Sequence, residues 1–469
     1  MRNRCLFTAL FVFLLPVWQL GLSQTLSASQ EAGASTPTAA RPGSDSAKPY
    51  DTAFKYVVTF YPRWFTYLQA ANLNKLIGPV RISPIYHAVV AINDDTFYAS
   101  AFFSLTDEPV IVTVPSTDDV YSVLVLDEYG NVVPGITAAQ PGQPGAVYAL
   151  TGPGWSGTLP EGVIQIQPGV NNGEIIFRAD KFVKNGSMYE DMRQEAETFR
   201  RSLCLIPLSQ YQPCPSAGQA AILPELVFAV PYKGLAVATI ANQPILFLKT
   251  LQTAVLSPTT QPLTPHERKL SDKFNAFFSN PGNLPQMALA TQAAHAEIDG
   301  NYLTTTWKGT NWVHFTDIAE WVHPSQYLDR SSVTDYIQFG NNLSAASYYH
   351  AFVDRDGIPL NGSAHDYVLT FQQGQQPLVQ RFWSVTAYLP VSIELVPNSA
   401  NKYVVASYTP GLVTAPDGSV SIVMAVNKPA GVPEANWLPI PNGPFNILLR
   451  AYGPENADTY VPPPIQVLP

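Results

Sequence analysis

The strongest constraint on the fold is a series of short β-branched runs that proline and glycine interrupt. Between residues 80 and 178 four runs have strand length: Val110–Val114, Val120–Leu126, Val163–Ile166 and Ile175–Phe177. The chain holds 43 Pro and 29 Gly against 13% charged residues, a balance that disfavours coiled coils and highly charged disordered chains. We therefore predict an N-terminal antiparallel β domain over residues 50–186.

Strand signals return near the C-terminus. The expected strands are Tyr349–Val353, Asp366–Phe371, Arg381–Tyr388, Tyr403–Tyr408, Ser419–Val426 and Asn446–Tyr452. The first two flank the turn-rich Asp354–Gly357, which is typical of a hairpin and fits a turn better than a calcium loop. Close, regular spacing with no helix between the strands predicts a sandwich or jelly-roll-like barrel over residues 347–469.

Residues 187–346 show helical signals instead. Ser187–Glu190 has the spacing of a capping box before an apolar periodicity of three to four residues. Thr264–Glu267 combines a cap, a proline at the first helical position and a glutamate three residues after the cap. Further helices are expected at 285–298 and 332–343, with extended chain around 226–240. The predicted fold class is mainly β with a helical middle, with two jelly-roll-like antiparallel β-sandwich or barrel domains.

The N-terminus has the pattern of a secretory signal peptide. Arg2 and Arg4 precede the apolar run Leu6–Leu15, and small residues follow up to Ser23. A membrane anchor is the alternative, but this run is short for a bilayer core of about 30 Å. We predict a signal peptide over residues 1–23 and a flexible leader over 24–49, which has few large apolar side chains. The protein is expected to be secreted, without stable membrane insertion.

Charge and cysteine content limit the partners. The net charge of −9 argues against a nucleic-acid partner, because such proteins present a basic face to phosphates. Cys5 lies within the predicted signal, so Cys204 and Cys214 are expected to form one disulfide in an oxidising compartment. Two buried free thiols are the alternative, and a zinc site is disfavoured because neither cysteine belongs to a CxxC pair.

Three Asn-x-Ser sequons begin at Asn185, Asn342 and Asn361. They are glycan acceptors only if the host glycosylates proteins in its secretory pathway. Several common enzyme signatures are absent from the sequence: it contains no GxSxG, Walker loop or HExxH. We therefore predict no cofactor and no metal, and the sequence leaves open whether the protein is an enzyme.

Two stretches carry a family resemblance. The first comprises Asn93–Tyr98, Val110–Pro115 and Leu150–Gly157, and it resembles the domain-of-unknown-function 1254 family. The second comprises Glu434–Asn446, Arg450–Pro454 and Pro462–Pro464, and it resembles the domain-of-unknown-function 1214 family. The resemblance implies two jelly-roll-like β domains with intervening helices and brings no established reaction with it. Asp94 is a departure, since family members usually have Ala or Gly there.

The Asn93–Tyr98 segment is the first candidate binding site. If it is extended, Asp94, Thr96 and Tyr98 lie on one face, where they could bind a ligand or a cation. The alternative is a satisfied turn in which Asn93 and Asp95 bond nearby backbone amides.

Trp437, Phe445 and Arg450 form a second candidate group. Aromatic faces with a guanidinium suit stacking on a sugar, and core packing is the alternative. A carboxylate with a histidine is the minimum for general base catalysis, which makes Asp95 with His87 or His350 the candidate catalytic pair. A lone histidine is more often structural.

Two functions follow as hypotheses. The first is a secreted, non-catalytic β protein that binds a carbohydrate or other extracellular ligand, with Asn93, Asp95, Thr96, Tyr98, Trp437 and Arg450 as candidate ligand-binding residues, or that assembles on a surface as a homo-oligomer. The alternative is an extracellular hydrolase whose site lies near Asn93–Tyr98.

Overall fold

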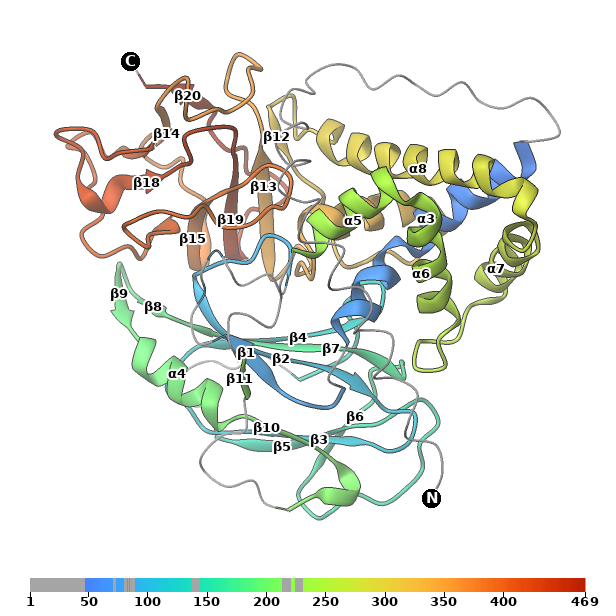
Figure 1. The fold of residues 1–469 in the computed structure, drawn as a ribbon. Coiled ribbons are helices and arrows are strands. Elements are labelled where there is room, and N and C mark those ends of the chain that lie inside the picture. The colour runs from blue at the N-terminus through green and yellow to red at the C-terminus, as the bar shows by residue number, and fades with distance from the viewer. Residues whose placement is uncertain are drawn as a thin grey trace. The chain divides into compact units, whose positions relative to one another are not determined.

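The described chain forms two β sandwiches and a group of helices (Figure 1). The computed structural model describes residues 47–70, 73–79, 82, 84, 89–136, 144–212, 221–223 and 231–468. The predicted signal peptide and most of the predicted leader lie outside these residues. The fold therefore combines β and α structure, and the coarse prediction of β regions separated by a helical middle is confirmed.

The first sandwich consists of two sheets around one core. Its first sheet has the order β11 (Ala221–Leu223), β1 (Ile77–Pro79), β2 (Thr96–Ser104), β7 (Asn172–Asp180), β4 (Tyr121–Asp127). Its second sheet has the order β10 (Cys204–Pro207), β3 (Val110–Val114), β5 (Ala146–Leu150), β6 (Ile164–Ile166). Phe103 and Phe177 of the first sheet and Val112 of the second belong to the same buried cluster. Burial of these apolar faces joins the two sheets.

Strand β7 lies between β2 and β4 in the first sheet and is buried along its whole length. Successive side chains of a strand point to opposite faces. Ile175 and Phe177 therefore face the sandwich core, while Glu174, Ile176 and Arg178 face the other way. That outer face is covered too, because Ile176 packs against Phe339 of a distant segment. This covered face therefore buries three ionisable residues of β7: Glu174, Arg178 and Asp180.

The second sandwich is built in the same way. One sheet has the order β12 (Trp312–Val313), β13 (Ala346–Ala351), β19 (Asn446–Pro454), β15 (Val379–Tyr388), β16 (Val404–Ala406). The other has the order β18 (Trp437–Pro439), β17 (Val420–Ala425), β14 (Tyr367–Phe371), β20 (Ile465–Val467). Trp383 and Leu449 of the first sheet share a core with Ile422 and Leu369 of the second. Of the two alternatives predicted, the sandwich is the one observed.

Six helices pack together beside the sandwiches (Figure 1). They are α3 (Ala47–Gln69), α5 (Tyr232–Asn242), α6 (Pro244–Leu256), α7 (Pro265–Phe278), α8 (Leu284–Thr304) and α9 (Tyr327–Tyr336). Helix α3 contacts α6, α7, α8 and α9. The capping box predicted at Thr264–Glu267 is confirmed, with the Glu267 amide donating to the Thr264 hydroxyl. The helix predicted at 285–298 is confirmed as part of α8.

Helix α3 occupies the place where we predicted the end of the leader and the start of a β domain. Its buried residues Tyr56, Phe60 and Trp64 recur at helical spacing, so the helical pattern is present in the sequence. The stretch is rich in aromatic and β-branched residues, which favour strands locally. Packing of the apolar face against four other helices outweighs that local preference.

The capping-box prediction at Ser187–Glu190 is wrong. These residues belong to a hairpin of β8 (Phe182–Asn185) and β9 (Met188–Asp191), and α4 (Arg193–Ser202) begins only after it. The reason is Gly186, because the two-residue hairpin loop consists of Gly186 and Ser187, and Gly186 at its first position has a φ of 64°, which glycine adopts readily. A turn signal thus overrides the spacing of a helix cap.

Two further predictions are corrected in the second half of the chain. The stretch expected to be extended around 226–240 is helical from Tyr232 onward. The strands flanking Asp354–Gly357 do not pair with each other, since β13 and β14 belong to opposite sheets. The turn itself is present: Asp354 accepts hydrogen bonds from the amides of Asp356 and Ile358. The turn residues therefore mark a crossing between sheets.

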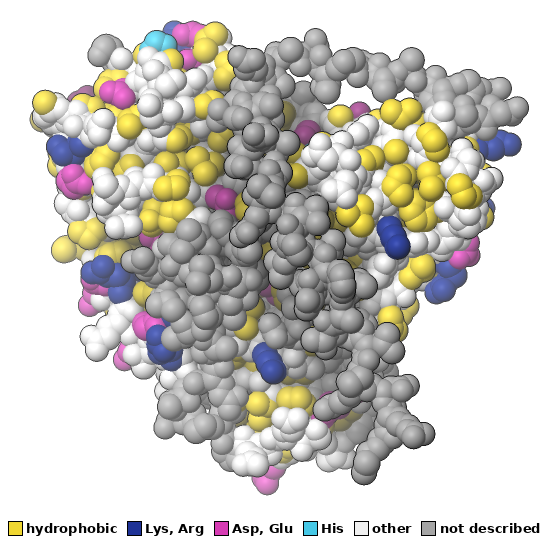
Figure 2. Space-filling view, viewed as in Figure 1, with side chains coloured by type: hydrophobic (Ala, Val, Ile, Leu, Met, Phe, Trp, Pro, Cys, Tyr) yellow, Lys and Arg dark blue, Asp and Glu magenta, His cyan; other side chains and the backbone are white. Residues whose placement is uncertain are grey.

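Figure 2 shows one face on which charged side chains are sparse and hydrophobic side chains gather in several groups, including over the helices. Exposed apolar residues of the helices include Leu256, Leu289 and Leu303. Within the described ranges, none of the helices combines the length and the apolar character needed to cross a bilayer.

Candidate functional site

The Asn93–Tyr98 segment leads into β2 and lies against the second sandwich. Asn93, Asp95 and Thr96 are all buried. The amide of Asp95 donates to Asn93 Oδ1 at 3.1 Å, so the Asn93 bond of the turn considered in the sequence analysis is present. Asn93 Nδ2 also donates to the hydroxyl of Tyr452 on β19 at 2.5 Å. The segment therefore joins residues that lie far apart in the sequence.

Asp95 is held by two hydroxyl groups of the second sandwich region. Ser384 Oγ donates to its carboxylate at 2.9 Å, and the Tyr408 hydroxyl donates at 2.6 Å. Burial raises the pKa of Asp95, although the charge of Arg450 and these two hydrogen bonds oppose the rise. Both carboxylate oxygens of Asp95 thus have partners within the protein.

His350, one of the two histidines proposed to act with Asp95, has other partners. His350 on β13 is fully buried, with Nδ1 2.9 Å from the Tyr302 hydroxyl and Nε2 2.7 Å from Asn446 Oδ1. Burial lowers the pKa of His350 to about 3, so it is neutral near pH 7. His87 lies outside the described residues.

A cavity of about 50 Å³ lies between the facing sheets of the two sandwiches. Its polar lining comes from β2, β7, β13, β19, the turn before β2 and the segment after α9: Asn93, Tyr98, Ser100, Glu174, Arg178, Gln338, Tyr348, Arg450 and Tyr452. Three sequence-predicted site residues, Asn93, Tyr98 and Arg450, therefore meet here. We call this space the inner cavity.

Two arginines dominate the charge of the inner cavity. Arg178 donates to the carbonyl of Phe339 at 3.2 Å, and its guanidinium lies over the ring of Tyr98. Arg450 donates to the carbonyl of Ala91 at 2.5 Å and to the Tyr388 hydroxyl at 2.8 Å. Both are buried, and no described carboxylate forms an ion pair with either. Arg178 Nε and Arg450 Nη1 also lack a hydrogen-bond partner within the described chain.

Glu174 lines the same cavity, four residues before Arg178 on β7. Burial raises its pKa to about 8, against the opposing effect of the Arg178 charge. The carboxyl is therefore mostly protonated at neutral pH and does not neutralise the arginines. Sequence reasoning missed both residues because it recognised only the apolar run between them. The sequence signal that could have found them is their spacing: Glu174 and Arg178 flank an apolar run and lie on one face of the strand.

Trp437 lies elsewhere. It belongs to β18, in the sheet opposite that of Arg450, and its indole donates to the carbonyl of Ala425 at 2.9 Å. Trp437 packs with Val423 and Ala425. Phe445 is buried in the core of the second sandwich. The structure therefore does not bring Trp437 and Arg450 into one site, and Trp437 serves the core.

The predicted modification sites differ in exposure. Asn185 is exposed at the β8–β9 turn, whereas Asn342 and Asn361 are partly buried. The Asn361 side chain accepts from the amide and hydroxyl of Ser363. Cys204 is buried at the start of β10. Cys214 lies outside the described residues, so the disulfide stays a prediction.

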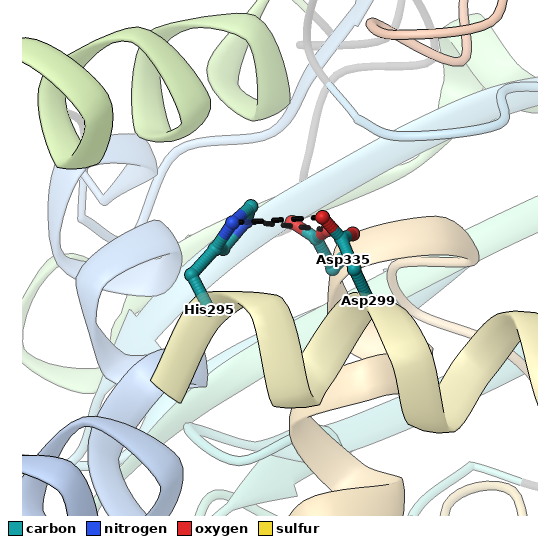
Figure 3. Close-up of side chains that lie close together, drawn as sticks. All are labelled: His295, Asp299 and Asp335. Atoms are coloured by element: carbon teal, nitrogen blue, oxygen red, sulfur yellow. Dashed lines mark ion pairs between the residues drawn. The ribbon is translucent and has the colours of Figure 1, made fainter. Parts of the chain in front are cut away.

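A second polar cluster lies among the helices. Figure 3 shows His295 and Asp299 of α8 converging with Asp335 of α9. Their potential ligand atoms all lie within 4.8 Å of one another, which is compatible with a metal-binding set. Lys233 of α5 forms an ion pair with Asp335 and lies 3.8 Å from Asp299. The Tyr61 hydroxyl of α3 also donates to Asp335, so we call this group the helical cluster.

The helical cluster carries its own cations. Burial raises the pKa of Asp335, but Lys233 and His295 outweigh it and hold that pKa well below the usual range. Burial lowers the pKa of His295, but the carboxylates of Asp335 and Asp299, 3.7 Å and 3.6 Å from its ring nitrogens, raise it overall. Two carboxylates thus face an ammonium and a protonatable imidazole. An added metal ion would have to displace the Lys233 ammonium.

The comparisons with known proteins place the chain in a class defined by two domains. The family described as "Protein of unknown function (DUF1254)" matches residues 73–207. The family described as "Protein of unknown function (DUF1214)" matches residues 345–456. The resemblance seen in the sequence is confirmed, and the chain belongs to the proteins that carry these two domains in this order. The inner cavity is lined by residues of both domains.

One solved structure shares this fold. The VPA0106 protein from Vibrio parahaemolyticus is 19% identical, with a TM-score of 0.57 over 90% of this chain and 100% of that chain. A putative uncharacterized protein from Burkholderia cenocepacia is 13% identical, with a TM-score of 0.42 over 90% of this chain and 95% of that chain. No curated protein matches the chain. The first likeness supports the fold and carries no function.

Proposed function

We propose that the protein binds a small carboxylate-bearing ligand in the inner cavity. The observation that carries this proposal is the presence of two buried arginines without a carboxylate partner among the described residues. Burying an unpaired charge is unfavourable, whereas an arginine paired with a carboxylate gains charge-assisted hydrogen bonds. A bound anion would therefore satisfy Arg178 Nε and Arg450 Nη1, which lack partners in the described chain.

The size and the neutral groups of the cavity define the ligand further. A space of about 50 Å³ accepts a few waters or a small acid group and excludes a whole sugar. Protonated Glu174 would donate a hydrogen bond to the anion, and Tyr98, Tyr348 and Tyr452 add hydroxyl groups. The flat guanidinium suits the two oxygens of a carboxylate.

Titration calorimetry of the mature chain with acetate tests the proposal. We expect Arg178→Gln and Arg450→Gln each to weaken acetate binding by about tenfold or more, since each removes a charged hydrogen-bond donor. Arg201→Gln is the matched control, because Arg201 is exposed and pairs with Glu197 on α4. Failure of the wild type to bind acetate, or unchanged binding by both cavity variants, would contradict the proposal.

Acid–base chemistry is the second candidate function, and the pKa of about 8 for Glu174 favours it. A carboxyl that titrates near neutral pH within a cavity is typical of a general acid or base. Glu174 fits this role better than Asp95, because Glu174 Oε2 has no hydrogen-bond partner within the described residues. Turnover in a screen of esters, amides and glycosides should be abolished by Glu174→Gln. If Glu174→Gln leaves turnover intact and Asp95→Ala abolishes it, Asp95 is the general acid or base instead.

We also propose that the protein acts outside the cell. The signal-peptide pattern of residues 1–23 and the sequons support secretion, and exposed Asn185 is the best placed acceptor. Groups of exposed apolar side chains on the helices support a homo-oligomer. We propose a jelly-roll type of sandwich for both domains, supported by the two facing sheets in each. Light scattering and detection of the chain in culture medium test the first two points.

A further inference from the structure

The turn before β2 and the first residues of β2 border a second, larger space. Asp94, Thr96 and Tyr98 all line a pocket of about 260 Å³. The rest of its wall consists of Pro79, Ile82, Phe97, Lys181, Arg193, Arg200, Asn401 and Tyr403. We call this space the outer pocket. Tyr98 is the residue that lines both the outer pocket and the inner cavity.

The charges of the outer pocket are balanced within the protein, unlike those of the inner cavity. Lys181 pairs with Asp94 at 2.5 Å, and Arg193 pairs with Asp191 at 2.5 Å. Arg200 pairs with Glu197 at 2.6 Å and also donates to the carbonyl of Pro79. With each cation matched to a carboxylate, the pocket has no net demand for an anion. Its paired groups still offer hydrogen-bond donors and acceptors.

The wall combines these polar groups with aromatic rings. Phe97 and Tyr403 contribute rings, and Tyr403 donates to Asn401 Oδ1 at 3.2 Å. Arg200 is buried, and its Nε has no hydrogen-bond partner within the described residues. A buried donor without a partner costs free energy that a ligand acceptor would recover. Asn401 is exposed and has a φ of 49°, a left-handed conformation that asparagine tolerates in turns.

From this geometry we infer that the outer pocket is a separate binding site for a neutral polyhydroxylated ring, the chemistry of a sugar. Hydroxyl groups would accept from Arg200 and Lys181 and donate to Asp94 and Asn401, while the ring packs against aromatic faces. The volume is several times that of the inner cavity. The inference does not depend on the anion proposed for the inner cavity.

Saturation-transfer NMR and titration of the full mature chain with glucose, galactose and mannose test the inference. We expect at least one of these sugars to bind, and Asn401→Gly to weaken that binding by about fivefold, the effect of one lost hydrogen bond. Glycine suits this position because it removes the amide without placing a Cβ on a left-handed backbone. Asp94→Asn is the second variant, and it keeps the shape while it removes the charge. Exposed Lys249→Ala on α6 is the control.

The outcomes separate the two sites. Sugar binding that Asn401→Gly and Asp94→Asn weaken, but Arg178→Gln leaves intact, supports the outer pocket. Absence of binding by all three sugars, competition of acetate with the sugar, or unchanged sugar binding in both folded outer-pocket variants overturns it. If the protein binds a sugar but not acetate, the result contradicts the proposed function of the inner cavity and leaves the outer pocket supported.

Discussion

The inner cavity and the helical cluster both bury charged side chains from elements far apart in the sequence, yet their charges are arranged differently. In the helical cluster, Lys233 and His295 face Asp299 and Asp335 within ion-pair distance. In the inner cavity, Arg178 and Arg450 form no ion pair with any described residue. Glu174 beside them is mostly protonated at neutral pH.

This difference separates a structural role from a binding role. Four helices contribute to the helical cluster, and its balanced charges fix how α3, α5, α8 and α9 pack. The inner cavity retains unmet hydrogen-bonding capacity and space beside it. A buried charge that its own protein neutralises needs no ligand, whereas one left without a partner creates a demand for a ligand of opposite charge.

The largest expected effect is the loss of a balanced buried charge. Asp335→Asn leaves Lys233 and His295 buried without their main partner, so we expect the free energy of unfolding to fall by about 3 to 5 kcal/mol. Urea denaturation monitored by circular dichroism measures this change. Asp191→Asn is the control, since it breaks the exposed pair with Arg193 and should cost less than about 1 kcal/mol. If both variants lose the same free energy of unfolding, the buried ion pairs of the helical cluster stabilise the fold no more than an exposed pair does.

The second effect concerns the dependence of stability on pH. The pKa of Glu174 is raised from 4.5 to about 8 in the folded protein, so the folded state holds this proton more tightly than the unfolded state. Its contribution to stability is full below pH 4.5 and is lost as the pH rises through about 8. The slope due to this group is at most about 1.4 kcal/mol per pH unit.

Glu174→Gln should remove that slope, because glutamine does not titrate. Denaturation midpoints measured across this pH range compare the variant with the wild type. Glu190→Gln in β9 serves as the exposed control and should leave the profile unchanged. A Glu174→Gln profile that still falls as steeply as the wild type would mean that Glu174 is ionised in the folded state, and would weaken its assigned role as a donor.

The smallest expected effect is the removal of an unbalanced charge. Arg178→Met loses the hydrogen bond to Phe339 but also relieves the burial of an unpaired guanidinium. We therefore expect the free energy of unfolding without ligand to change by less than about 2 kcal/mol. Thermal melts with and without acetate measure this, and the acetate-dependent rise in Tm should be lost. A destabilisation as large as that of Asp335→Asn would show that Arg178 is paired after all.

Local sequence patterns predicted individual elements well where packing agreed with them. The run Val110–Val114 forms β3 over the same residues, and Thr264–Glu267 caps α7 as expected. Prediction failed where two local signals competed, as at Ser187, or where tertiary packing overrode propensity, as in α3. Pairing between strands was also beyond local reasoning, because the turn at Asp354–Gly357 joins strands of opposite sheets.

For the site, the sequence by itself determined that polar groups gather before β2. Only the tertiary structure decided that Asn93, Tyr98 and Arg450 meet Glu174 and Arg178 across the two sandwiches. The physical reason is that alternation along a strand fixes which side chains share a face, whereas the partner of that face depends on how separate sheets pack. Whether a buried arginine is neutralised depends on that packing, and so does its function.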